Sequence, residues 1–331
     1  MKARFISIGV AGALALAAGL RADVTIRYQN DFQPAASLQP LLQQMFKAAQ
    51  ANGSGTEIRM KGGKSYTVTG GWTQIVDFTK QEVTILDPAH KTYATFPVSE
   101  LADKMTAAMP QSAPQQSQAL ENVMSQIKVA TDTKITGHTD TILGVEAEER
   151  EVTVSMDLPL PPAMQQPGGG PAIKLVMHIW TAKPDETMRN PAIRELAGYS
   201  QWQKYALNPA GMLEKITGKF PGVANALKPM FEELFKNSGV MMRNRVEMYM
   251  PFVATLAKQM SAQGQGKAMP NIDPDAPLMV MNQEVAELSS APVDAALFEV
   301  PKDYTSAPPG DVIKNPLGAR VAAMQAPAAK P

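Results

Sequence analysis

Residues 55–97 constrain the fold most, because they form a regular series of short runs with strand composition. Each run is rich in Ile, Val, Thr, Tyr, Phe and Trp, and turn residues separate the runs at Gly62-Gly63, Gly70-Gly71, Thr79-Lys80 and Asp87-Pro88. Runs of this kind between Gly, Asp and Pro are typical of an antiparallel meander. By the period of two, Trp72, Val76 and Phe78 fall on one face of their run. One face of the predicted sheet is therefore apolar and needs a cover.

The first 22 residues have the features of a Sec-type secretory signal peptide. Lys2 and Arg4 precede an apolar run over 6–20, and a cleavage site is expected after Ala22. The apolar run is short for a bilayer span, so we expect residues 1–22 to direct export to the periplasm or the medium. The chain has no cysteine, so it offers neither a lipobox for acylation nor a disulfide. Its stability must then come from its core.

The charge balance excludes some classes of partner. The whole chain carries 31 basic and 31 acidic residues, and the predicted signal peptide holds basic residues only. The exported chain is therefore slightly acidic, which predicts no nucleic-acid partner. Beyond residue 22 no stretch is long and apolar enough to predict a membrane-spanning segment.

We expect residues 23–304 to form one domain, within which hydrophobic periodicity predicts the strands and helices. Alternation predicts strands, at 23–29, twice within 128–156 around a turn at Leu143-Gly144, and at 172–181, 240–250 and 278–288. We expect 145–156 and 172–181 to be neighbours in one long hairpin. Helical spacing predicts helices, at 38–51, 99–109 and 120–127, with a helical insertion over 187–238. Residues 305–331 are rich in Ala and Pro, which predicts a disordered tail.

This order of elements is similar to that of a family of secreted bacterial proteins of unknown function, whose relatives share a LolA/LolB-like half-barrel. The likeness rests on three sets of motifs: IVDF at 75–78 with ILDP at 85–88 and KTYATFP at 91–97, TGHTDTILGVEAEEREV at 136–152 with HIW at 178–180, and FEVPKDY at 298–304. It implies an α+β fold in which helices pack on the concave face of a curved antiparallel sheet. LolA-like proteins carry the acyl chains of lipoproteins in that concavity, and no catalytic residue comes with the resemblance. The helical insertion at 187–238 departs from the compact carrier pattern.

The polar residues show no pattern of catalysis or metal binding. His90, His138 and His178 have no metal-motif spacing, and no cysteine could complete a zinc site. There is no G-x-S-x-G elbow, and the Gly-rich segments lack the lysine of a phosphate loop. The acidic residues of 146–151 are interleaved with Arg150, so we interpret them as a solvated strand face. We therefore expect neither an enzyme nor a bound metal or cofactor.

Methionine is the most unusual component, with 21 residues in the chain. Met248 and Met250 are two residues apart on one predicted strand, and Met279 and Met281 are two apart on another, so each pair shares a face. Three interpretations remain open. The pairs could pack in the core, line a plastic apolar cavity for acyl chains, or bind Cu(I) through soft thioethers.

The leading hypothesis is an exported, non-enzymatic protein that binds a lipid or a lipoprotein acyl chain between sheet and helices. The residues expected to line the cavity are Trp72, Val76, Phe78, Met242, Met248 and Met250 from strands, with Trp202 and Phe231 from helices. The alternative is a structural or envelope protein-interaction module whose sheet is filled by its own helices. That module would contact an envelope protein through exposed surface and bind no lipid.

Overall fold

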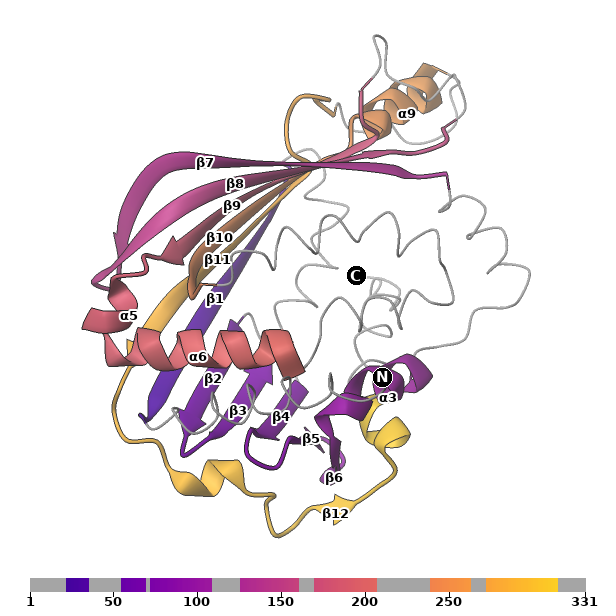
Figure 1. Ribbon diagram of the computed structural model, residues 1–331. Helices are drawn as coiled ribbons and strands as arrows, with labels where there is room; N and C mark the ends of the chain where they lie inside the picture. The colour runs from indigo at the N-terminus through magenta and orange to yellow at the C-terminus, as the bar shows by residue number, and fades with distance from the viewer. Residues whose placement is uncertain are drawn as a thin grey trace, which may run out of the picture.

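Twelve strands form one open sheet in the computed structural model, in the order β12-β6-β5-β4-β3-β2-β1-β11-β10-β9-β8-β7 (Figure 1). The structure describes residues 22–35, 55–69, 72–108, 126–160, 170–206, 239–262 and 272–314. Neighbouring strands pair antiparallel, except that β12 runs parallel to β6. The prediction of an antiparallel sheet is therefore wrong at this one edge, and the sheet is mixed.

The predicted meander is confirmed as one end of the sheet. Its strands are β2 (Gly55–Lys61), β3 (Lys64–Thr69), β4 (Trp72–Asp77), β5 (Glu82–Asp87) and β6 (Thr92–Pro97). The turn between β2 and β3 uses Gly62 and Gly63 at φ of 57° and 79°, where glycine meets no steric penalty.

The other end of the sheet is built from long strands that follow the predicted ranges. They are β7 (Lys128–Ile142), β8 (Val145–Asp157), β9 (Ile173–Ala182), β10 (Met241–Tyr249) and β11 (Met279–Ser289). The expected hairpin of β8 and β9 is confirmed, as is the turn at Leu143-Gly144, where both residues have positive φ. The first strand, β1 (Val24–Pro34), pairs with both β2 and β11 and so joins the two ends.

The sheet curves around one helix that lies across its concave side (Figure 1). Strongly twisted open sheets of more than about ten strands usually curl. The helical elements are η2 (Val98–Glu100), α3 (Leu101–Ala108), α5 (Glu186–Arg189), α6 (Pro191–Ala206), α9 (Pro251–Ala262) and η4 (Ala295–Phe298). Of these, α6 runs across β2, β3 and β4. The α+β class and the curved sheet of the prediction are confirmed.

Local sequence explains where α6 begins and which side it buries. The side-chain oxygen of Asn190 accepts hydrogen bonds from the backbone N–H groups of Ala192, at 3.0 Å, and Ile193, at 3.4 Å. Pro191 at the first helical position lacks an N–H that would need a partner. The buried stripe of α6 then follows helical spacing, with Ile193, Leu196, Tyr199 and Trp202.

The main core lies between α6 and the concave face. The ring of Phe78, just after β4, lies 4.5 Å from the ring of Trp202 and 5.5 Å from that of Tyr199, measured between centroids. Val24 and Ile26 of β1 belong to the same cluster and are fully buried. A smaller cluster lies on the opposite face of the meander, where Phe298 of η4 packs against Ile75 and Leu86. Both faces of the meander are therefore covered.

The C-terminal segment differs from the prediction of a disordered tail. Residues 305 and 306 form β12 (Thr305–Ser306), and a helical turn follows at 309–314. Val312 and Ile313 in that turn have 0% exposure and belong to the main core. The prediction is thus wrong for 305–314, because two large apolar residues in an otherwise Ala- and Pro-rich stretch are enough to anchor it. Residues 315–331 lie outside the described residues.

Other predictions also fall outside the described residues. These are 1–21 of the expected signal peptide, the expected helix at 38–51, nearly all of that at 120–127, and 207–238 of the helical insertion. The described start of the insertion is helical, as expected, in α5 and α6.

Ile313→Ala should lower the free energy of unfolding by about 2–5 kcal/mol, because it leaves a cavity in the main core. Lys314→Ala, at an exposed neighbouring position, is the matched control and should change it by less than about 0.5 kcal/mol. Urea denaturation of both variants measures the difference. Equal stability of the two variants would mean that this segment does not belong to the core.

Candidate functional site

Four of the eight predicted ligand-binding residues come together in the main core under α6. Val76, Phe78, Met242 and Trp202 have exposed fractions of 4%, 1%, 0% and 1%. Side chains of this chain therefore fill the space between β4 and α6. A ligand would reach these four residues only if α6 moved.

The other four predicted ligand-binding residues are not brought together with these. Met248 lies on β10 between Leu175 of β9 and Met279 of β11. Met250 follows the end of β10 and packs against the α9 cluster of Ala254 and Ala257 rather than sharing a site with Met248. Trp72 begins β4, but its side chain is not among those described, and Phe231 lies outside the described residues.

Around Met248 the register aligns a strip of apolar side chains across five neighbouring strands. We call it the methionine strip, and it consists of Val152, Val154, Leu175, Met177, Val246, Met248, Met279, Met281 and Phe32. The valines at its β8 end are fully buried, whereas Leu175, Val246 and the methionines of β10 and β11 are only half-buried. At the usual strand spacing the strip is about 19 Å long.

Along β1 and β11, the methionine strip and the main core lie on the same face of the sheet. Along β1, Ile26 and Tyr28 contact the main core, and alternation places Phe32 on their face. Phe32 pairs with Met281, which pairs in turn with Val246. Figure 1 shows α6 on this face over the meander strands, and the ends of β8, β9 and β10 reach the main core through Ala147, Ala182 and Met242. The strip is thus an apolar region next to the main core, and its members Val152, Val154 and Met177 belong to a smaller buried cluster of their own.

A row of polar side chains borders the strip on the side of the core. Asn244 of β10 lies between Ile179 of β9 and Gln283 of β11, and Gln283 donates a hydrogen bond of 2.9 Å to Asn30 of β1. The side-chain oxygen of Asn244 is buried and has no hydrogen-bond partner. A buried polar atom without a partner typically costs about 1–3 kcal/mol.

A second polar group lies on the opposite face of β8 and β9 from the strip. Both carboxylate oxygens of Glu149 are bonded there: Nδ1 of His138 lies 2.7 Å from one and Nδ1 of His178 lies 2.8 Å from the other. The hydroxyl of Thr136 donates a further bond of 2.7 Å. Glu149 is only 5% exposed, so the prediction that the whole acidic run is solvated is wrong at this position.

A bulge in β7 explains why sequence reasoning missed the Glu149 group. The register of β7 against β8 shifts between Ile135 and Thr139, and Gly137 has a φ of 77°. The bulge turns Thr136 and His138 toward the same carboxylate. Burial raises the pKa of Glu149, but the hydrogen bonds from Thr136, His138 and His178 outweigh it, so the net shift of this pKa is downward.

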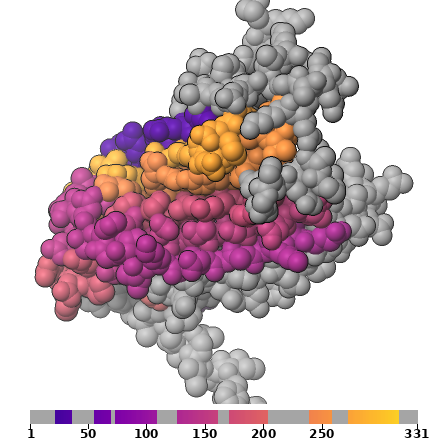
Figure 2. All heavy atoms as spheres, turned by 90° about the horizontal axis from the view of Figure 1, so that it is seen from above, coloured from indigo at the N-terminus to yellow at the C-terminus, as the bar shows by residue number. Residues whose placement is uncertain are grey.

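Other charged residues on that face pair with one another. Arg243 lies 2.6 Å from Asp140 and 2.7 Å from Glu284, and its guanidinium lies 5.3 Å from the ring centroid of Trp180. These contacts link β7, β9, β10 and β11, and β8 lies between β7 and β9 in this part of the sheet (Figure 2). The charges of Arg243, Asp140 and Glu284 are thus paired with one another within the sheet.

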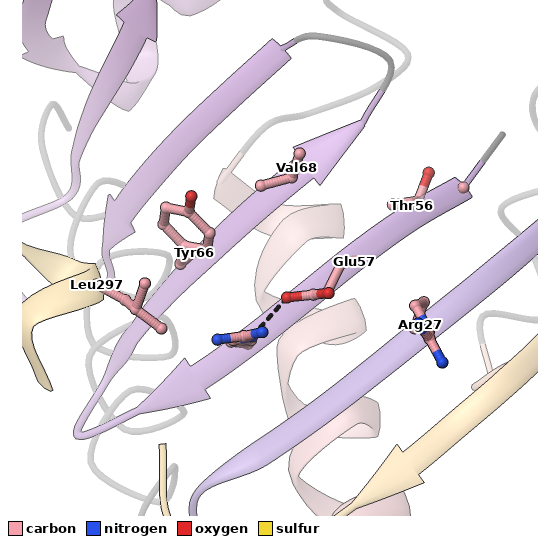
Figure 3. A pocket seen from close by; sticks show the side chains of 8 residues that line it. Arg27, Thr56, Glu57, Tyr66, Val68 and Leu297 are labelled. Atoms are coloured by element: carbon pink, nitrogen blue, oxygen red, sulfur yellow. Dashed lines mark ion pairs between the residues drawn. The ribbon is translucent and has the colours of Figure 1, made fainter. Parts of the chain in front are cut away.

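A groove of about 330 Å³ lies over β1, β2 and β3 on the face opposite α6 (Figure 3). Arg27, Arg59, Tyr66 and Leu297 are among its lining residues. Arg59 forms an ion pair with Glu57 at 2.5 Å, and Arg27 pairs with Glu287 at 3.3 Å. Both guanidinium groups that line the described part of the groove therefore already have acidic partners.

Among the described residues, no three His, Asp or Glu side chains are arranged to hold a metal ion. None of the helices in the described ranges is both long enough and apolar enough for a membrane span.

No protein-family model and no curated protein matches this chain. Among solved structures, the chain is similar to the crystal structure of lipoprotein LppX from Mycobacterium tuberculosis, at 10% sequence identity and a TM-score of 0.26. The match covers 86% of this chain and 95% of that chain. A similarity at this level carries no conclusion about function, and membership of the LolA/LolB-like family stays a prediction.

Glu149→Gln should lower the free energy of unfolding at pH 7 by about 1.5–3 kcal/mol, since it weakens charge-assisted hydrogen bonds. The pKa of Glu149 is lowered in the fold, so its contribution is present above the ordinary glutamate pKa of about 4.3 and is lost as pH falls through the folded value. The difference between variant and wild type should therefore shrink below about pH 4.

Denaturation of the wild type and of Glu149→Gln across pH 3–7 measures the difference in their free energies of unfolding. Glu148→Gln, at an exposed neighbouring position, is the control. A difference between Glu149→Gln and wild type that stays constant over this range would contradict the assignment.

Proposed function

We propose that this protein is an exported, non-enzymatic binding protein that holds a lipid or acyl chain against the methionine strip. The observation that supports it is an apolar region about 19 Å long, buried at its β8 end and half-buried over β10 and β11, beside a core that already fills itself. Contiguous apolar surface of this kind commonly marks a binding site.

The dimensions of the strip suit one acyl chain. Each leaflet of a bilayer contributes about half of a hydrocarbon core about 30 Å thick, so an acyl chain extends over about 15 Å. The strip is slightly longer than that. Each methylene taken from water contributes about 0.8 kcal/mol, so even part of a chain would supply useful affinity before the costs of association.

Methionine fits this role better than it fits a rigid core. Met248, Met279 and Met281 lie on adjacent strands and stay half-buried. Their unbranched, polarisable side chains adapt to apolar partners of different shape. The strip offers hydrophobic contact but no nucleophile or general base, which supports binding rather than catalysis. Export rests on the predicted signal peptide, residues 1–22.

The second candidate function is an envelope protein-interaction module without a lipid. One observation favours it: Phe78, Trp202 and Met242, expected to line a cavity, are packed against the chain itself. In that case the methionine strip belongs to the core of the free protein, and the contact with an envelope protein uses another surface.

Met248→Glu should abolish acyl-lipid binding, because it places a charge at the centre of the strip between Leu175 and Met279. Native mass spectrometry of the mature protein from an envelope extract, and again after incubation with lipids, measures the bound mass. Met188→Glu introduces the same charge at a methionine that is 74% exposed and should bind lipid like the wild type.

Circular dichroism checks that the Met248→Glu variant keeps its sheet. A wild-type protein that shows only its own mass, in the extract and after incubation with lipids, would rule out the lipid-binding function and leave the interaction module.

A further inference from the structure

At the border of the methionine strip, the side-chain oxygen of Asn244 is buried without a hydrogen-bond partner. Asn244 lies one row from Val246 on the same face of β10, and by register it lies beside Ile179. Buried side-chain oxygens in proteins nearly always accept a hydrogen bond. The side-chain oxygen of Asn30, in the same row, follows this rule because it accepts the hydrogen bond that Gln283 donates. Asn244 does not, because Ile179 on one side has no donor and the side-chain amide of Gln283 on the other side is bonded to Asn30.

A core role does not explain this residue. An apolar side chain at position 244 would continue the surface of Ile179 and Val246 without leaving a buried acceptor. An acceptor at the border of an apolar strip is instead suited to an amphiphile, whose hydrocarbon follows the strip and whose polar end reaches the row of Asn244, Gln283 and Asn30. Binding such a ligand would remove water from the strip and satisfy the oxygen at once.

We propose that the ligand is an amphiphile with an O–H or N–H donor at the end of its hydrocarbon chain, and that this donor hydrogen-bonds to Oδ1 of Asn244. The inference rests on the proposed function and adds a chemical class to it. A chain that ends in a hydroxyl fits the site, whereas the same chain capped as an ether lacks the donor. Asn244 is thereby a specificity-determining residue.

The test compares 1-hexadecanol with 1-methoxyhexadecane, which share the C16 chain and differ in the hydroxyl donor. Both are delivered from cyclodextrin to the mature protein, and the dissociation constants are measured by native mass spectrometry. The wild type should bind the alcohol roughly three- to tenfold more tightly than the ether, as expected for one net hydrogen bond. In Asn244→Leu the two constants should become equal, with the ether bound at least as tightly as by the wild type.

The outcomes separate the two proposals. If the wild type binds both probes equally, the donor inference is wrong while the lipid-binding function stands. If Met248→Glu loses both probes but Asn244→Leu keeps the preference for the alcohol, the hydroxyl is recognised elsewhere and Asn244 is not the specificity residue. If the wild type binds neither probe, the proposed function fails and the inference fails with it. The wild-type comparison needs no variant, so a folding defect in Asn244→Leu does not prevent a decision.

Discussion

The sheet has more apolar face than its main helix can cover, and the rest of the structure follows from this. Twelve strands at about 4.8 Å spacing span about 53 Å, while the 16 residues of α6 extend over about 24 Å. The sheet curves around α6, and Phe78 and Trp202 pack against each other where α6 covers the apolar face. The long strands beyond β1 carry the methionine strip, in which Met248, Met279 and Met281 stay half-buried.

Local sequence patterns predicted the elements, while non-local pairing determined the sites. Gly62-Gly63 and Leu143-Gly144 mark turns through their own backbone preferences, so the meander and the long hairpins could be predicted. Alternation likewise predicts that Met248 and Met281 lie on strand faces. That these methionines share one strip depends on β10 pairing with β11, which no local pattern shows.

The predictions that were wrong have the same physical origin, which is contact between segments far apart in the sequence. The glutamate run at 146–151 looks solvated because its partners, His138 and His178, come from two other strands, and a bulge in β7 aims one of them. The segment around Ile313 looks disordered by composition, yet the core accepts its few apolar side chains. Phe78 and Trp202 were expected to line a cavity, but alternation gives the face of a side chain and not what packs against it.

Binding at the methionine strip can be tested directly by photolabelling with an acyl chain that carries a diazirine, followed by peptide mass spectrometry. We expect crosslinks on β9, β10 and β11 at Leu175, Met248 and the Met279–Met281 pair, and we expect unlabelled lipid to compete with the labelling. Labelling confined to the opposite face, around Arg243 and Trp180, or labelling that unlabelled lipid does not reduce, would contradict binding at the methionine strip.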